Sequence, residues 1–170
     1  MIVQIDTREK KAELARIQRG LERAGVRTIN SKLYVGDYMS LDNAFLVIDR
    51  KKDLQELCGN ITQQHERFQA ELMRAREIGI RIIILCEHGG NIKTLEDVYF
   101  WQNPRLLKSP KAVTGKTLYK SLCTIHDRYG VRFEFCDKRH TADKIVELLN
   151  NGKRLDQVTQ TNHGQRDLEY

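Results

Sequence analysis

The sequence lacks the features that mark several common classes of protein. No apolar run approaches the ~18 residues that a membrane-spanning helix needs, and a strand pattern begins at once, where a signal peptide would stand. The chain has four cysteines but no C-x-x-C pair, so a zinc site is not expected. Three of them lie in or beside apolar segments, as is typical of free thiols in a reducing compartment: Cys58, Cys86 and Cys136.

A nucleotide-binding P-loop is also absent. Gly115-Lys116-Thr117 is similar to the end of such a loop, but Pro110 stands where its first glycine is required. The composition is moderately basic, because 29 Lys and Arg against 23 Asp and Glu give a net charge of +6. This charge is consistent with a polyanionic partner, but an inference of nucleic-acid binding also requires particular residues.

The order of the expected elements indicates an α/β fold. The segment 27–51 has the pattern of a strand meander, and further strands are expected over residues 2–6, 80–86 and 131–136. Helical periodicity predicts helices over residues 9–24, 54–61, 63–78, 117–129 and 141–150. The run 80–86 is almost continuously apolar, which is typical of a strand covered on both faces.

The most informative segment runs from Leu33 to Lys51. Its two halves are rich in β-branched and aromatic residues, and turn residues around Asn43 separate them, so a β-hairpin is expected. With the turn centred on Asn43, Asp37 lies directly opposite Asp49. Lys51 points to the same face as Asp49, because side chains alternate along a strand. Opposed carboxylates repel each other, and a divalent cation between them would remove that cost.

These three side chains predict a metal-assisted hydrolytic site. Carboxylates are ligands that suit Mg²⁺ or Mn²⁺, and such an ion polarises a phosphodiester and activates water. Lys51 would orient or deprotonate that water, or neutralise charge on the phosphate. The alternative is a set of ordinary solvated charges on an exposed strand. The matched positions of Asp37 and Asp49 in apolar strands favour a site.

The surrounding sequence resembles the nuclease domain of the XPF-type structure-specific endonucleases. The chain has counterparts of four of the family's motifs in the same order. The motifs D-x-R-E, G-D-Y, E-R-K and E-R-F correspond to Asp6-Thr7-Arg8-Glu9, Gly36-Asp37-Tyr38, Asp49-Arg50-Lys51 and Glu66-Arg67-Phe68. Asp49 replaces the family's glutamate, and the acid of the next helix comes one residue late, as Glu56. The resemblance covers residues 2–88 and implies a restriction-endonuclease-like core of the PD-(D/E)XK group, with a central mixed sheet flanked by helices.

The resemblance implies roles for further side chains. Asp6 would join Asp37 and Asp49 as a metal ligand; the alternative is an N-cap. Glu9 would lie beside the metal cluster; the alternative is an acid favoured by the helix macrodipole. Arg50 points away from Asp49 along the strand, so it is expected to pair with an acid or order the site. The candidate catalytic residues are therefore Asp6, Glu9, Asp37, Asp49, Arg50 and Lys51. Glu56 is a weaker candidate, because it matches the family's helix acid only with a spacing one residue longer.

Two polar surfaces are expected to contact DNA. Arg67 matches the family's arginine and, with Gln64, lies on the polar face of the helix over 63–78. A basic segment beside the aromatic residues 98–101 is expected to follow a nucleic-acid backbone through Lys108, Lys111 and Lys116. The alternative for both surfaces is an ordinary solvated face.

The expected function is that of a metal-dependent DNA endonuclease acting on flap, forked or other branched DNA. A Holliday-junction resolvase on the same fold and a catalytically silent DNA-binding scaffold are the alternatives. No helix-hairpin-helix pattern is recognisable, so DNA binding would rely on the domain's own basic surface, a homodimer or a partner protein. We expect one nuclease domain over residues 1–150 and a polar, flexible tail over 151–170. The expected location is the cytoplasm of a prokaryotic or phage-infected cell, or a eukaryotic nucleus.

Overall fold

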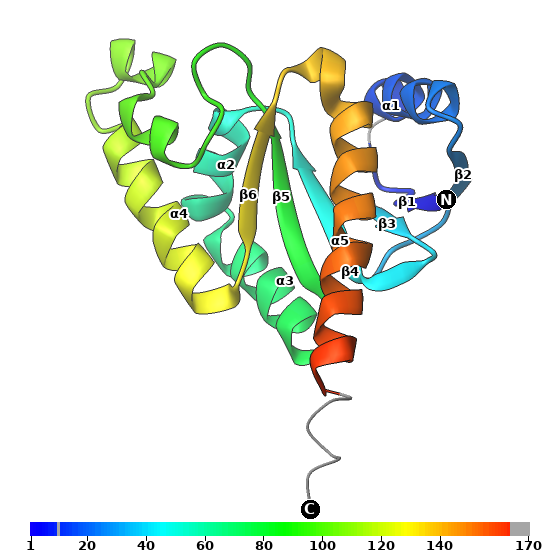
Figure 1. Cartoon of the computed structure of the whole chain (residues 1–170). Coiled ribbons are helices and arrows are strands. Elements are labelled where there is room, and N and C mark those ends of the chain that lie inside the picture. Colours follow the sequence, from blue (N-terminus) through cyan, green and yellow to red (C-terminus); the bar gives the residue numbers. More distant parts are fainter. Residues whose placement is uncertain (10, 164–170) are drawn as a thin grey trace, which may run out of the picture.

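The computed structural model describes residues 1–9 and 11–163, with side chains described as far as residue 152. A six-stranded sheet of order β2-β1-β3-β4-β5-β6 forms its centre (Figure 1). β1 pairs parallel with β2, and β4, β5 and β6 are parallel, whereas β3 is antiparallel to both neighbours. The strands are β1 (Ile2–Ile5), β2 (Arg27–Asn30), β3 (Tyr38–Ser40), β4 (Asn43–Lys51), β5 (Arg81–Glu87) and β6 (Arg132–Cys136).

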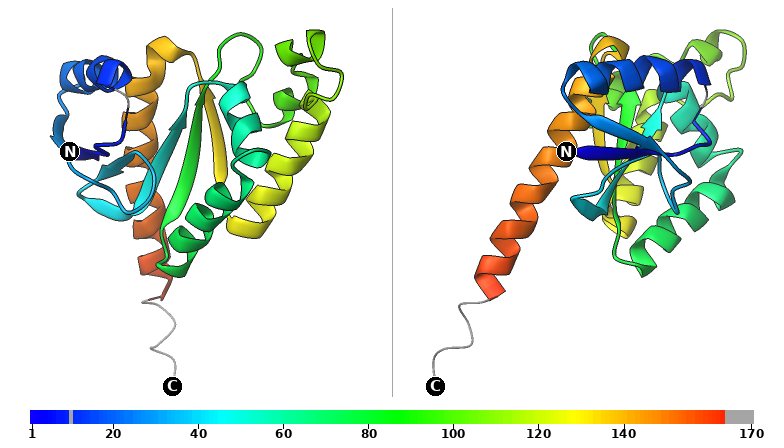
Figure 2. Two further views of the ribbon diagram at one scale, coloured as in Figure 1. Left: turned by 180° about the vertical axis from the view of Figure 1, so that it is seen from behind. Right: turned by 90° about the vertical axis from the view of Figure 1, so that its right-hand side faces the viewer.

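Helices cover both faces of this mixed sheet (Figures 1 and 2). The α-helices are α1 (Lys11–Arg23), α2 (Leu54–Ile61), α3 (His65–Glu77), α4 (Gly115–Tyr129) and α5 (Thr141–His163). The short 3₁₀ helices are η1 (Glu96–Phe100), η2 (Pro104–Leu107) and η3 (Lys138–His140). None of the described helices has the length and apolar character needed to cross a membrane. The expected α/β fold, a central mixed sheet flanked by helices, is confirmed.

The sheet separates two hydrophobic cores, and strand β5 contributes to both. Ile82 and Ile84 pack with α2, α3 and α4, whereas Ile83 and Leu85 pack with α1 and α5. Alternate side chains of a strand point to opposite faces. A strand that is buried on both faces therefore has the nearly continuous apolar sequence of residues 80–86.

Two details of the helices differ from the sequence-based expectation. The helix expected over residues 63–78 ends at Glu77, and Ile78, which follows it, is 46% exposed. Helix α5 continues to His163 instead of ending near Asn150, so part of the expected tail is helical; residues 164–170 lie outside the described part of the chain. Gly152 does not end the helix. A Cβ there would lie 2.2 Å from Leu46 Cδ2, so glycine allows α5 to pack against β4.

The β3–β4 hairpin keeps the expected register at the end that matters for the site. Tyr38 pairs with Ile48 and Met39 with Val47, as a hairpin centred on Asn43 requires. The register then shifts, Ser40 pairs with Asn43, and residues 41–42 form the connection. This irregularity lies at the hairpin tip, so it does not disturb the pairing next to residues 37 and 49.

Candidate active site

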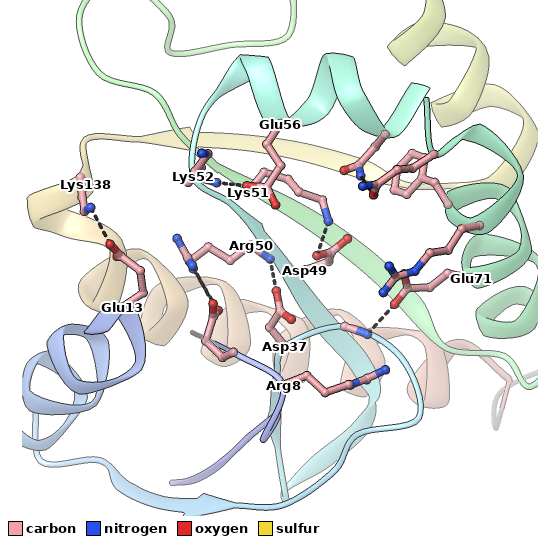
Figure 3. A pocket seen from close by; sticks show the side chains of 16 residues that line it. Arg8, Glu13, Asp37, Asp49, Arg50, Lys51, Lys52, Glu56, Glu71 and Lys138 are labelled. Carbon is pink, nitrogen blue, oxygen red and sulfur yellow. Dashed lines mark hydrogen bonds and ion pairs between the residues drawn. The ribbon is translucent and has the colours of Figure 1, made fainter. Parts of the chain in front are cut away.

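A pocket of about 450 Å³ opens at the carboxyl end of β4, between the loop before β3 and helices α1, α2 and α3 (Figure 3). Its charges are balanced, because six acidic and six basic side chains line it. They are Glu9, Glu13, Asp37, Asp49, Glu56 and Glu71, and Arg8, Arg50, Lys51, Lys52, Arg67 and Lys138.

Asp37 enters the pocket from a loop held tightly against β4. Gly36 has φ +67°, and a Cβ there would lie 2.2 Å from Val47 Cγ1, so only glycine permits this close approach. The Asp37 backbone N–H donates to Ile48 O at 2.8 Å. Its carboxylate Oδ2 accepts from the Arg50 backbone N–H at 2.7 Å. These bonds fix the carboxylate beside the strand that carries Asp49.

Asp49 and Lys51 share one face of β4, as the strand alternation predicts. Lys51 Nζ donates to Asp49 Oδ1 at 2.8 Å, and both side chains are largely buried. The ammonium also lies 5.8 Å from the centre of the Phe68 ring, where a cation–π contact adds to its stability. Burial opposes the charge of Lys51, but the carboxylates of Asp49 and Asp37 outweigh it and raise the pKa of the ammonium.

The two carboxylates form a pair that suits a cation. Burial, and then the negative charge of Asp49, raise the pKa of Asp37 well above its ordinary value. Within the described residues, no group of three or more His, Cys, Asp or Glu side chains is placed to hold a metal ion. Mg²⁺ typically takes only one or two protein carboxylates and completes its shell with water and substrate phosphate. The pair of Asp37 and Asp49 therefore fits such an ion.

Arg50 points to the other face of β4 and joins a buried ion-pair network. Its guanidinium contacts Glu9 Oε1 at 2.7 Å and Glu87 Oε2 at 3.0 Å, so it pairs with acids as expected. Burial opposes its charge, but Glu9 outweighs it and raises the pKa of Arg50. Glu87 also accepts from the Arg16 guanidinium and from Thr141 Oγ1. The network thus ties β4 to β5, α1 and α5.

The structure does not bring Asp6 into the pocket. Its carboxylate accepts from the backbone N–H of Arg8 and Leu33, both at 2.7 Å, and from the Arg8 guanidinium at 2.8 and 2.9 Å. Burial opposes ionisation, but these bonds to Arg8 and Leu33 outweigh it and lower the pKa of Asp6. These contacts fasten β1 to the loop before β3, and the expected role of Asp6 as a metal ligand stays a prediction.

The other expected site residues divide between the pocket and a separate surface. Glu56, Gln64 and Arg67 line the pocket. Glu56 Oε2 also accepts from the Lys52 backbone N–H at 2.8 Å, while Asp53 caps α2 by accepting from the Glu56 backbone N–H at 2.8 Å. The three lysines expected to contact DNA, Lys108, Lys111 and Lys116, are exposed on the segment between η2 and the first turn of α4. They do not line the pocket.

Sequence reasoning missed several residues that line or support the site. Lys52, Glu56 and Asn60 follow at intervals of four along α2 and its approach, so helical spacing offered a signal for Lys52 and Asn60. Lys138 offered none, because tertiary folding brings it from the far part of the chain to Glu13, with Nζ 2.7 Å from Oε1. Glu87 ends an apolar strand and likewise belongs to no local motif.

The central mixed sheet flanked by helices has the restriction-endonuclease-like fold expected from the sequence. A family model of the ERCC4 domain matches residues 5–148, and the chain belongs to the ERCC4 domain family. This confirms the resemblance to the XPF-type nuclease domain.

Two solved structures are similar to this chain. XPF from Aeropyrum pernix is 23% identical with a TM-score of 0.64, covering 94% of this chain and 69% of that chain. XPF from Aeropyrum pernix in complex with DNA is 22% identical with a TM-score of 0.64, covering 90% of this chain and 65% of that chain. The chain thus spans about two thirds of the length of either structure. No match was found among curated protein sequences.

Proposed function

We propose that this chain is a metal-dependent DNA endonuclease that hydrolyses phosphodiester bonds at flaps, forks or other branched DNA. The observation that carries the proposal is the pocket in which Asp37 and Asp49 lie together, with Lys51 Nζ 2.8 Å from Asp49. Membership of the ERCC4 domain family and the fold shared with XPF support it.

Asp37 and Asp49 would hold Mg²⁺ or Mn²⁺, which supplies Lewis-acid activation of the scissile phosphate and of water. Lys51 lies beside this pair and is suited to stabilise the charge that develops on the phosphate. Arg50 acts through its backbone, since its N–H holds the Asp37 carboxylate while its side chain is fixed by Glu9 and Glu87. We assign Arg50 and Glu9 a positioning role.

The basic side chains around the pocket suit a polyanionic substrate. Arg67 and Lys52 are exposed and line the pocket, where they would meet phosphates on either side of the cleaved bond. The central carboxylates would therefore bind the cation, and the exposed basic side chains would bind the DNA. A homodimer remains a prediction, which light scattering of the full chain would test.

The experiment compares labelled flap, fork, four-way-junction and plain duplex DNA in Mg²⁺, Mn²⁺ or EDTA. Asp49→Asn should abolish cleavage and keep binding, because it preserves the size of the side chain and removes a ligand charge. Asp127→Asn, at an exposed position of α4, is the matched control and should cut normally. Cleavage that survives in EDTA, or in Asp49→Asn, would contradict the proposal.

The same panel separates the alternatives. Preference for the four-way junction would indicate a resolvase on this fold. Binding of every branched substrate without cleavage in any metal would indicate a silent scaffold. The paired carboxylates favour the enzyme, because a scaffold gains nothing from two repelling acids.

A further inference from the structure

A second groove continues from the catalytic pocket over α2. Its lining includes Lys52, Gln55, Glu56, Asn60, Gln64 and Arg105, and its volume is about 240 Å³. All of these except Gln55 and Arg105 also line the catalytic pocket. We call this hollow the α2 groove. It extends the catalytic pocket in one direction, toward Arg105.

The far wall of the α2 groove is fastened to α2 by a buried asparagine. The Gln55 amide donates to Asn103 Oδ1, which also accepts from the Arg105 backbone N–H at 3.0 Å. Asn103 Nδ2 in turn donates to Val113 O at 2.6 Å. Because Asn103 holds both ends of the 103–113 segment, the backbone at Arg105 has a fixed place beside the groove.

The segment that carries Arg105 exposes apolar side chains among basic ones. Phe100 is 74% exposed at the end of η1, and Leu107 is 92% exposed in η2. The Tyr99 ring packs edge-on against Phe100 with centroids 5.1 Å apart, and Lys116 Nζ lies 5.8 Å from the Tyr99 ring centre. Lys108 and Lys111 are exposed on the same segment. In Figures 1 and 2 this segment lies beside the end of α2 where that helix begins.

We propose that the α2 groove and Phe100 bind the unpaired strand of a DNA junction. Lys52 and Arg105 would contact its phosphates, and Phe100 would stack on a base. The inference rests on the proposed function for the kind of substrate, and it adds the residues that distinguish an unpaired strand from a duplex.

The exposed Phe100 ring favours an unpaired strand over a duplex, and the basic side chains suit the phosphates of either. Exposed aromatic rings gain contact with base faces, which a single strand presents and a stacked duplex hides. The basic side chains complement the phosphates that such a strand carries with it.

The test measures binding by fluorescence anisotropy, in EDTA so that nothing is cut. The probes are a labelled single strand and the blunt duplex of the same sequence. Phe100→Ala should weaken single-strand binding about 5- to 150-fold, the loss expected for one base–aromatic stack, and leave duplex binding unchanged. Arg105→Gln should weaken single-strand binding and reduce the slope of log affinity against log salt by about one.

Two matched controls should bind as the wild type does. Phe45→Ala removes a ring that is 64% exposed at the end of β4 remote from Asp49. Arg19→Gln removes an exposed charge on α1. Thermal melting shows that each variant is folded.

Three outcomes would overturn the inference. The first is that Phe100→Ala binds a single strand as the wild type does, and the second is that it loses affinity for single strand and duplex equally. The third is that it changes the oligomeric state without changing DNA affinity, which would identify the apolar surface as a protein contact. Cleavage plays no part in these readouts, so an inactive chain that shows the single-strand loss would refute only the proposed function.

Discussion

Glu87 is the residue whose removal should reveal how the buried ion-pair network supports the site. Its side chain is fully buried and accepts from three donors: the Arg50 guanidinium at 3.0 Å, the Arg16 guanidinium and Thr141 Oγ1 at 2.6 Å. Glu87→Gln keeps the size of the side chain. It removes the negative charge and places an amide NH₂ where a carboxylate oxygen accepted hydrogen bonds.

The expected loss follows from the burial of the remaining partner. Removing one member of a buried ion pair typically costs about 3–5 kcal/mol, because the other charge stays buried without compensation. For a chain of this size, that loss corresponds to a fall in Tm of roughly 6–20 °C. Cleavage should fall as well, since displacement of Arg50 moves the backbone N–H that holds Asp37.

Urea unfolding followed by circular dichroism measures the free-energy change directly. Glu134→Gln is the control, because Glu134 also pairs with an arginine, Arg132, but both side chains reach solvent; its loss should stay below about 1 kcal/mol. If Glu87→Gln were no more destabilised than Glu134→Gln, the network would not support the fold as argued.

Three further predictions concern the pocket and its walls. Asp37→Asn should stabilise the metal-free protein by about 0.5–2 kcal/mol, because it removes a carboxylate whose raised pKa marks an unfavourable charge; Mg²⁺ should raise the Tm of the wild type only, and an equal rise in the variant would count against Asp37 as a ligand. A hydrogen bond from Lys138 lowers the pKa of Glu13 to about 2 from 4.5, so its contribution to stability is complete above pH 4.5 and disappears as the pH falls through 2. Glu13→Gln should therefore cost about 1 kcal/mol at neutral pH and progressively less as the pH falls toward and below 2 in urea unfolding. A difference that does not change with pH would refute this reasoning. Gly36→Ala should cost about 2–5 kcal/mol from its positive φ and its clash with β4, whereas Gly59→Ala, with open space at its Cβ, should cost nothing; equal unfolding midpoints would contradict the clash.

The sequence by itself determined the elements and the central pair of the site. Periodicity alone places α2 at 54–61 and strands over the apolar runs, because local backbone preference and burial on one or two faces leave a regular pattern. The alternation of β4 puts Lys51 beside Asp49, since side-chain direction along a strand is fixed by its geometry. The hairpin likewise predicts that Asp37 lies near Asp49, because a short connection fixes the register of its two strands.

Only the tertiary structure decided which other polar residues join them. Asp6 and Glu9 are three residues apart, yet Asp6 binds Arg8 and Leu33 while Glu9 reaches Arg50. Arg50 meets Glu87 because parallel pairing of β4 and β5 places two strand ends side by side. Contacts of this kind join residues far apart in the sequence, so the local spacing of residues does not predict them. They depend on how the helices and strands pack, and that packing forms the pocket around a pair of carboxylates that the sequence already predicts.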